Sequence, residues 1–107
     1  METYNFPEHI KNDTFDGISF TINVNGSPLN LTGASILASF KKNFDTTKTL
    51  SSPTDITITT PTSGQFTINQ KVIDWPAGTY NYDIAITLNT GVIKTYIKGT
   101  WNIVEDL

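Results

Sequence analysis

The chain has 107 residues, and its seven Lys and ten acidic residues, with no Arg, give a formal net charge of −3. This length fits one domain. The absence of Cys excludes disulfides, thiolate zinc sites and cysteine nucleophiles. Scattered lysines do not make the basic stripe that a nucleic-acid binder needs, and no segment approaches the ~20 consecutive apolar residues of a membrane span. We therefore expect neither nucleic acid nor a membrane as a partner.

The first half of the chain alternates apolar and polar residues with a period of two, which is typical of strands buried on one face. The segment 18–24 is expected to bury Ile18, Phe20, Ile22 and Val24. It ends at Asn25-Gly26, a pair that tolerates positive φ in tight turns. The segment 34–41 forms a second alternating set, in which Leu37 is the apolar exception on the exposed face.

The middle of the chain carries weaker signals. Residues 41–55 are polar, with Phe44 and Leu50 as the only large apolar side chains, and this pattern predicts a short edge strand and a loop. Two short strands, around 56–58 and 66–68, are separated by a turn at 61–64. A compact turn, 72–78, contains Trp75 and precedes the last third of the chain.

The last third predicts a hairpin. Residues 80–88 place Tyr80 and Tyr82 on one face together with isoleucines, and Asn89-Thr90-Gly91 supplies a three-residue loop. The return strand, 93–103, is expected to keep the core-facing register from Ile93 to Ile103 without a shift, with Trp101 in the core. Seven or eight antiparallel strands at these spacings predict an all-β fold, a single two-sheet sandwich.

Tyr80 follows a tight turn, Pro76-Ala77-Gly78-Thr79, at the start of a late strand. In Ig-like sandwiches a Tyr at this place forms a corner, in which its hydroxyl bonds back to the chain a few residues upstream. The pattern therefore favours an Ig-like β-sandwich with a tyrosine corner. An ordinary core tyrosine is an equally good interpretation of the same residues.

Candidate catalytic and metal-binding residues are few. His9 is the only imidazole and lies in a polar segment, which favours an exposed surface His. The acidic pairs Asp13/Asp16 and Glu105/Asp106 lack the dense oxygen spacing of a calcium loop, so turn capping or solvated charge is the better interpretation. No nucleophile elbow or phosphate-binding glycine loop occurs. We therefore predict no catalytic residue, no metal and no cofactor: the protein is not expected to be an enzyme.

Binding residues are expected in two places. Residues 1–12 are interpreted as an N-terminal arm on a domain spanning 13–107, and Tyr4, Phe6 and Pro7 give this arm an apolar character. Such an arm either covers an edge of its own sandwich or docks on a neighbour. The second set, Lys94, Tyr96 and Lys98, is predicted to lie on the outward face of the last strand. Tyr96 is interpreted there as a cross-strand partner or an interface anchor.

Four segments resemble, in the same order, the small Ig-like modules of phage virion proteins, of which the N-terminal domain of the siphophage baseplate upper protein is typical. Asp13–Ile22 resembles the opening strand and Pro28–Ala34 the bridge "-pldLtGa-" into the second strand. Trp75–Ile84 resembles the corner "-lpaGtY-YDI-" and Gly99–Ile103 the closing "-G-w-i-" strand. Together they span residues 13 to 104, although members of the family usually continue into a long C-terminal region.

The resemblance implies a virion component made in the cytoplasm of a bacterial host, since the N-terminus has no signal-peptide pattern. The favoured function is an auxiliary, or decoration, protein attached to the capsid shell, with the major capsid protein as its partner. A baseplate, tail or neck adaptor is the first alternative. A carbohydrate-binding β-sandwich, taking a host glycan on an exposed aromatic platform of Tyr96, Tyr4 or Phe6, is an alternative of another class. A homo-oligomer is compatible with each.

Overall fold

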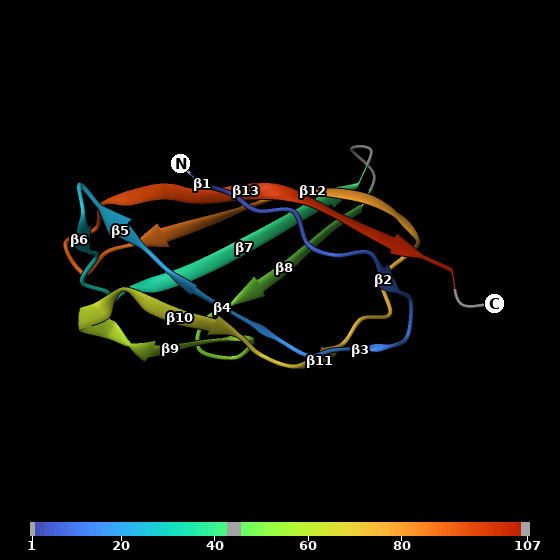
Figure 1. Ribbon diagram of the computed structural model, residues 1–107, viewed down its shortest axis with the longest axis horizontal. Coiled ribbons are helices and arrows are strands. Elements are labelled where there is room, and N and C mark those ends of the chain that lie inside the picture. The colour runs from blue at the N-terminus through green and yellow to red at the C-terminus, as the bar shows by residue number, and fades with distance from the viewer. Residues whose placement is uncertain (1, 43–45, 106–107) are drawn as a thin grey trace.

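The computed structural model describes residues 2–42 and 46–105, so the predicted position of Phe44 lies outside the described residues. Across these ranges the chain forms strands and one 3-10 turn, η1 (Pro61–Ser63), and no α-helix. The all-β class predicted from the period-two pattern is therefore confirmed. The strands lie in two layers along an elongated body of 44 × 25 × 22 Å (Figure 1). Within the described ranges, no helix is both long and apolar enough to cross a membrane.

The larger sheet contains the longest strands of the molecule. Its strand order is β1-β13-β12-β7-β8, and β2 also pairs with β13. The antiparallel strands of this sheet are β7 (Ser35–Lys42), β8 (Thr46–Ser51), β12 (Gly78–Thr87) and β13 (Ile93–Val104). Two short strands near the N-terminus, β1 (Glu2–Thr3) and β2 (His9–Ile10), pair with β13 in parallel. The expectation of antiparallel strands alone is wrong for these two.

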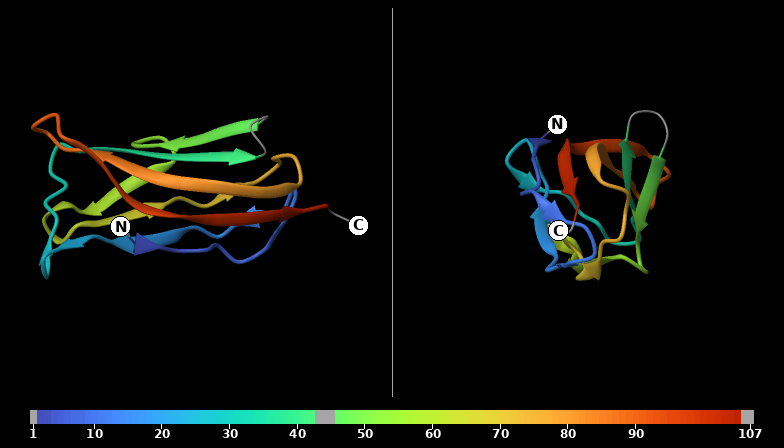
Figure 2. Two further views of the ribbon diagram at one scale, coloured as in Figure 1. Left: turned by 90° about the horizontal axis from the view of Figure 1, so that it is seen from above. Right: turned by 90° about the vertical axis from the view of Figure 1, so that its right-hand side faces the viewer.

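The second layer is built from shorter strands that face the larger sheet (Figure 2). Its three-stranded sheet has the order β4-β10-β9, all antiparallel. Its members are β4 (Ile18–Thr21), β9 (Ile56–Thr60) and β10 (Gln65–Ile68). Two-stranded ribbons extend from it: β3 (Thr14–Phe15) with β11 (Lys71–Val72), and β5 (Asn23–Val24) with β6 (Ser27–Pro28).

The core between the layers is rich in aromatic rings. The buried set from the larger sheet includes Phe40, Tyr82 and Trp101, and the second layer contributes Phe66 and several isoleucines. The rings of Phe40 and Tyr82 stack at 5.2 Å between centroids, while Phe20 reaches Phe66 at 5.6 Å. Burial of this apolar and aromatic surface is the main stabilising contribution to a domain without disulfides.

Several local predictions are confirmed. Asn25 and Gly26 both have positive φ, 54° and 81°, in the turn that joins β5 to β6. Residues 46–51 form the expected edge strand, and Leu37 is 44% exposed on the outer face. The Tyr80 hydroxyl donates a hydrogen bond to the carbonyl of Pro76 at 2.6 Å, as expected of a tyrosine corner.

The first alternating strand ends earlier than predicted. Ile22 is buried, whereas Val24 is 40% exposed. The reason is that β4 ends at Thr21, and the chain then leaves the sheet for the separate β5-β6 ribbon. Because a short two-stranded ribbon has no second layer over it, the alternation of Val24 with its neighbours does not bury its side chain.

The register predicted for the last strand is wrong beyond Tyr96. Ile84 pairs with Ile97 but Ala85 pairs with Thr95, so Tyr96 is an extra residue on β13. Such a β-bulge reverses which side chains face the core on one side of it. Tyr96 consequently packs against the core instead of facing outward, and Ile93, predicted in the core, is 67% exposed.

Candidate functional site

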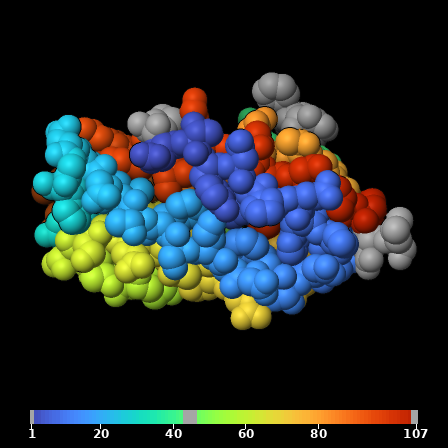
Figure 3. Space-filling model, viewed as in Figure 1, coloured from blue at the N-terminus to red at the C-terminus, as the bar shows by residue number. Residues whose placement is uncertain are grey.

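The N-terminal arm lies along β13 of its own chain, which is the first of the two arrangements considered from the sequence. Backbone bonds run from Tyr4 N to Lys98 O and from Phe6 N to Thr100 O, both 2.9 Å. A third, from Lys11 N to Val104 O, is 2.8 Å. In the space-filling view the arm, in dark blue, forms a ridge beside the red atoms of β13 (Figure 3). The arm therefore covers a sheet edge that would otherwise expose backbone groups.

Phe6 anchors the arm in the core. Its side chain is 6% exposed, and its ring lies 4.7 Å from Trp101, 5.0 Å from Tyr82 and 5.3 Å from Tyr4, measured between centroids. The edge-to-face arrangement with Tyr82 is a favourable geometry for aromatic pairs. Since Phe6 is buried within its own chain, its side chain is not part of the exposed surface.

Two side-chain hydrogen bonds fix the arm backbone over these rings. The Tyr82 hydroxyl donates to the carbonyl of Tyr4 at 2.5 Å, and Trp101 Nε1 donates to the carbonyl of Pro7 at 3.1 Å. Burial raises the pKa of the Tyr82 hydroxyl, with a smaller contribution from Tyr4. Burial likewise raises the pKa of Tyr80. Both hydroxyls therefore stay protonated donors through the neutral range.

Gly99 provides the space for the arm to cross β13. A Cβ built at Gly99 would overlap the carbonyl oxygen of Tyr4 and would lie 3.0 Å from Cε1 of Tyr82. Any larger residue at this position must displace the arm or distort the strand. This requirement was not recognised from the sequence, where Gly99 reads as one more glycine in a strand.

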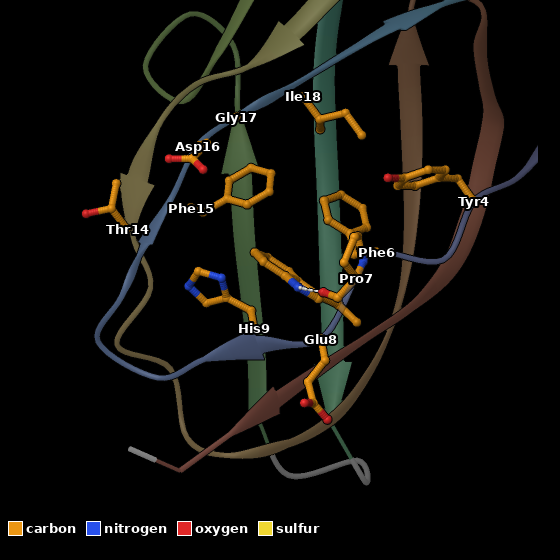
Figure 4. Close-up of a pocket in the computed structure, with 11 residues that line it drawn as sticks. Tyr4, Phe6, Pro7, Glu8, His9, Thr14, Phe15, Asp16, Gly17 and Ile18 are labelled. Atoms are coloured by element: carbon orange, nitrogen blue, oxygen red, sulfur yellow. Dashed lines mark hydrogen bonds between the residues drawn. The ribbon is translucent and has the colours of Figure 1, made fainter. Parts of the chain in front are cut away.

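A groove of about 250 Å³ lies between the arm and the segment 14–18 (Figure 4). Its walls include Tyr4, Phe15 and Trp101, with the carboxylates of Glu8 and Asp16 at its rim. His9, half-buried rather than exposed as predicted, packs its ring 5.6 Å from that of Trp101. Its Nε2 is 3.0 Å from the carbonyl oxygen of Asp13, so the imidazole bonds to backbone. In residues 2–42 and 46–105 no group of three His, Asp or Glu side chains is placed to hold a metal ion.

The structure brings part of the predicted binding set together. Tyr4 and Lys98 meet where the arm pairs with β13, and Pro7 lies further along the same edge. Lys94 and Lys98 are both exposed, but the bulge separates them: Lys94 pairs with the core-facing Ile86, and Lys98 pairs with Asp83 on the outer face. The interface role predicted for these residues stays a prediction.

The outer face of the larger sheet is a second candidate surface. Cross-strand rows of short side chains run over it from β8 to β13: Thr49, Ser39, Asp83 and Lys98, then Ser51, Leu37, Ala85 and Thr95. Ile93, at the end of the sheet, adds to the exposed apolar area with Leu37. Sequence alternation indicated the polar rows, but only the bulge assigns Ile93 and Thr95 to this face.

Comparisons of the chain with protein-family models, with curated proteins and with solved structures found no match.

Proposed function

We propose that this chain is a non-enzymatic structural protein of a phage particle, a decoration protein that binds the capsid shell through protein-protein contacts. Its fold would be an Ig-like β-sandwich, and its partner the major capsid protein. The protein would be made in the bacterial cytoplasm and retained in the virion. The resemblance of four segments to virion Ig-like modules motivates this proposal.

The observation that carries the proposal is the outer face of the larger sheet. Its side chains are short, mostly uncharged and arranged in flat rows, with Leu37 and Ile93 as exposed apolar contacts. Short side chains lose little rotamer freedom when they are covered. A broad, flat face of this kind suits contact with another folded protein better than it suits a small ligand, which is normally held in a concave pocket.

The tyrosine corner supports the Ig-like assignment. Tyr80 bonds to Pro76 at the start of β12, and Tyr82 follows two residues later, facing the core. This is the local arrangement of the late strand in Ig-like sandwiches. In the resembling modules the same segment, Trp75–Ile84, forms the corner.

The alternatives differ in measurable ways. A baseplate, tail or neck adaptor would share the fold but occur in far fewer copies. A carbohydrate-binding module would need an exposed aromatic platform, and within residues 2–42 and 46–105 every Tyr, Phe and Trp is buried or half-buried. The structural observations therefore favour the protein-protein function over the glycan-binding one.

The proposal is tested with particles assembled without this protein. Purified protein should bind such particles to saturation and stay bound through gradient sedimentation, whereas tail-less shells and isolated tails identify the site. Binding to shells supports the decoration function, and binding to tails alone supports the adaptor. If the protein binds neither, while an immobilised host glycan retains it, the proposal is wrong.

A further inference from the structure

The edges of the larger sheet differ in how much backbone they leave available. At the β13 edge the arm already occupies the backbone groups of Lys98 and Thr100. At the opposite edge lies β8, which pairs only with β7 (Figure 2). In the second layer the edge strand β9 begins at Ile56, a residue with 0% exposure. The accessible edge for a contact through backbone hydrogen bonds is therefore β8.

The hydrogen-bond phase of β8 identifies which residues point outward. Ser52 N donates to Ile36 O at 2.9 Å, and the register continues with Leu50 opposite Ala38 and Lys48 opposite Phe40. Because bonded and non-bonded pairs alternate along antiparallel strands, the backbone groups of the residues between these pairs face away from β7. These residues are Thr47, Thr49 and Ser51.

Ser51 is already satisfied. Asp55 N donates to Ser51 O at 2.7 Å, and Ser51 N donates to a carboxylate oxygen of Asp55 at 3.3 Å. Thr47 and Thr49 have no such partner among the residues that the structure describes, and both are exposed. Their outward N–H and C=O groups make a short, ready template for a further strand.

The chemistry of the edge indicates which strand fits. β8 contains neither proline nor a bulge, and the one charge between the two outward residues is Lys48. The Lys48 ammonium has no hydrogen bond or ion pair within the described part of the chain. A second copy of β8 paired about this point would place two Lys48 side chains opposite each other, which is unfavourable. A carboxylate at that position would be favourable.

We propose that β8 is the contact strand for the partner. It accepts a short extended segment of the virion protein to which it binds, hydrogen-bonded to Thr47 and Thr49, with an Asp or Glu of that segment opposite Lys48. This inference deepens the proposed function and rests on it. The added strand would extend the larger sheet by one strand and place the partner beside the outer face.

The test substitutes residues whose ladder bonds are not involved. Thr49→Pro removes an N–H that faces away from β7, so it blocks strand addition while leaving the β7-β8 ladder intact. Thr49→Val keeps the N–H and is the matched control. Binding of each variant to particles lacking the protein is measured by gradient sedimentation. Thr49→Pro should bind at least tenfold more weakly than wild type, and Thr49→Val should bind within a factor of two.

Charge and exchange provide measurements that do not depend on proline. Lys48→Glu should weaken binding more than Lys48→Gln, and the difference should shrink at high salt. The Thr47 and Thr49 amides should exchange rapidly with solvent in the free protein and slowly on the particle. Equal binding of Thr49→Pro and wild type, or unprotected Thr47 and Thr49 amides on the particle, overturns the inference. Absence of binding by the wild-type protein contradicts instead the proposed function.

Discussion

Gly99→Ala tests whether the arm is held in a seat built for it. The new Cβ would occupy the position of the Tyr4 carbonyl oxygen. Because Gly99 lies in the middle of a twelve-residue strand, held on both sides, the arm is the part that should yield. Lifting the arm withdraws Phe6 from the core and breaks its bonds to Trp101 and Tyr82.

The magnitude follows from the loss of Phe6. Emptying a buried phenylalanine site costs ~3–5 kcal/mol, and the freed arm recovers part of this as conformational entropy. We therefore expect Gly99→Ala to lower the free energy of unfolding by about 2–4 kcal/mol, or Tm by roughly 10–20 °C. Gly26→Ala is the control, since a Cβ at Gly26 meets no atom within 4 Å and adds only the strain of a positive φ, ~1–2 kcal/mol.

The assay combines urea denaturation with amide exchange. In Gly99→Ala the Tyr4 and Phe6 amides, which bond to β13, should lose protection, while those of the β7-β12 ladder keep it. In Gly26→Ala the arm amides should stay protected. A Gly99→Ala protein with wild-type stability and protected arm amides would refute the role assigned to this glycine.

Three further predictions concern the aromatic core. Trp101→Ala should lower the free energy of unfolding by ~3–5 kcal/mol, because Trp101 is 1% exposed; a cost below ~1 kcal/mol would contradict its place in the core. Tyr80→Phe removes only the hydroxyl bond to Pro76 and should cost ~0.5–1.5 kcal/mol in the same denaturation assay. Burial raises the folded-state pKa of Tyr80 and Tyr82, so their contribution is fully present below pH ~10 and is lost as the pH rises beyond it. Stability measured from pH 8 to 12 should fall less steeply in Tyr82→Phe than in wild type, and parallel slopes would exclude this cause.

The sequence predicted the parts of the fold that depend on simple alternation. Tyr80, Tyr82 and Trp101 were placed in the core because each lies in a run where apolar residues recur every second position. The same argument located the edge strand at 46–51. These predictions are confirmed because one face of each strand is covered by the opposite layer.

The wrong predictions arise where pairing departs from alternation. Tyr96 moved to the core side through a bulge, and a bulge depends on the partner strand rather than on its own sequence. The path of the arm depends on Gly99 and Tyr82, more than seventy residues away from Tyr4, and no local pattern carries that information. The outward phase of Thr47 and Thr49 likewise becomes visible only once the β7-β8 register is known.

The copy number of the protein in purified particles tests the central claim most directly. Quantitative mass spectrometry would compare its peptides with those of the major shell protein, which sets the number of shell subunits. A decoration protein follows the symmetry of the shell and should be present in hundreds of copies, whereas a tail or neck part follows a ring of about a dozen or fewer. We predict hundreds of copies per particle. Absence of the protein from purified particles would contradict the account.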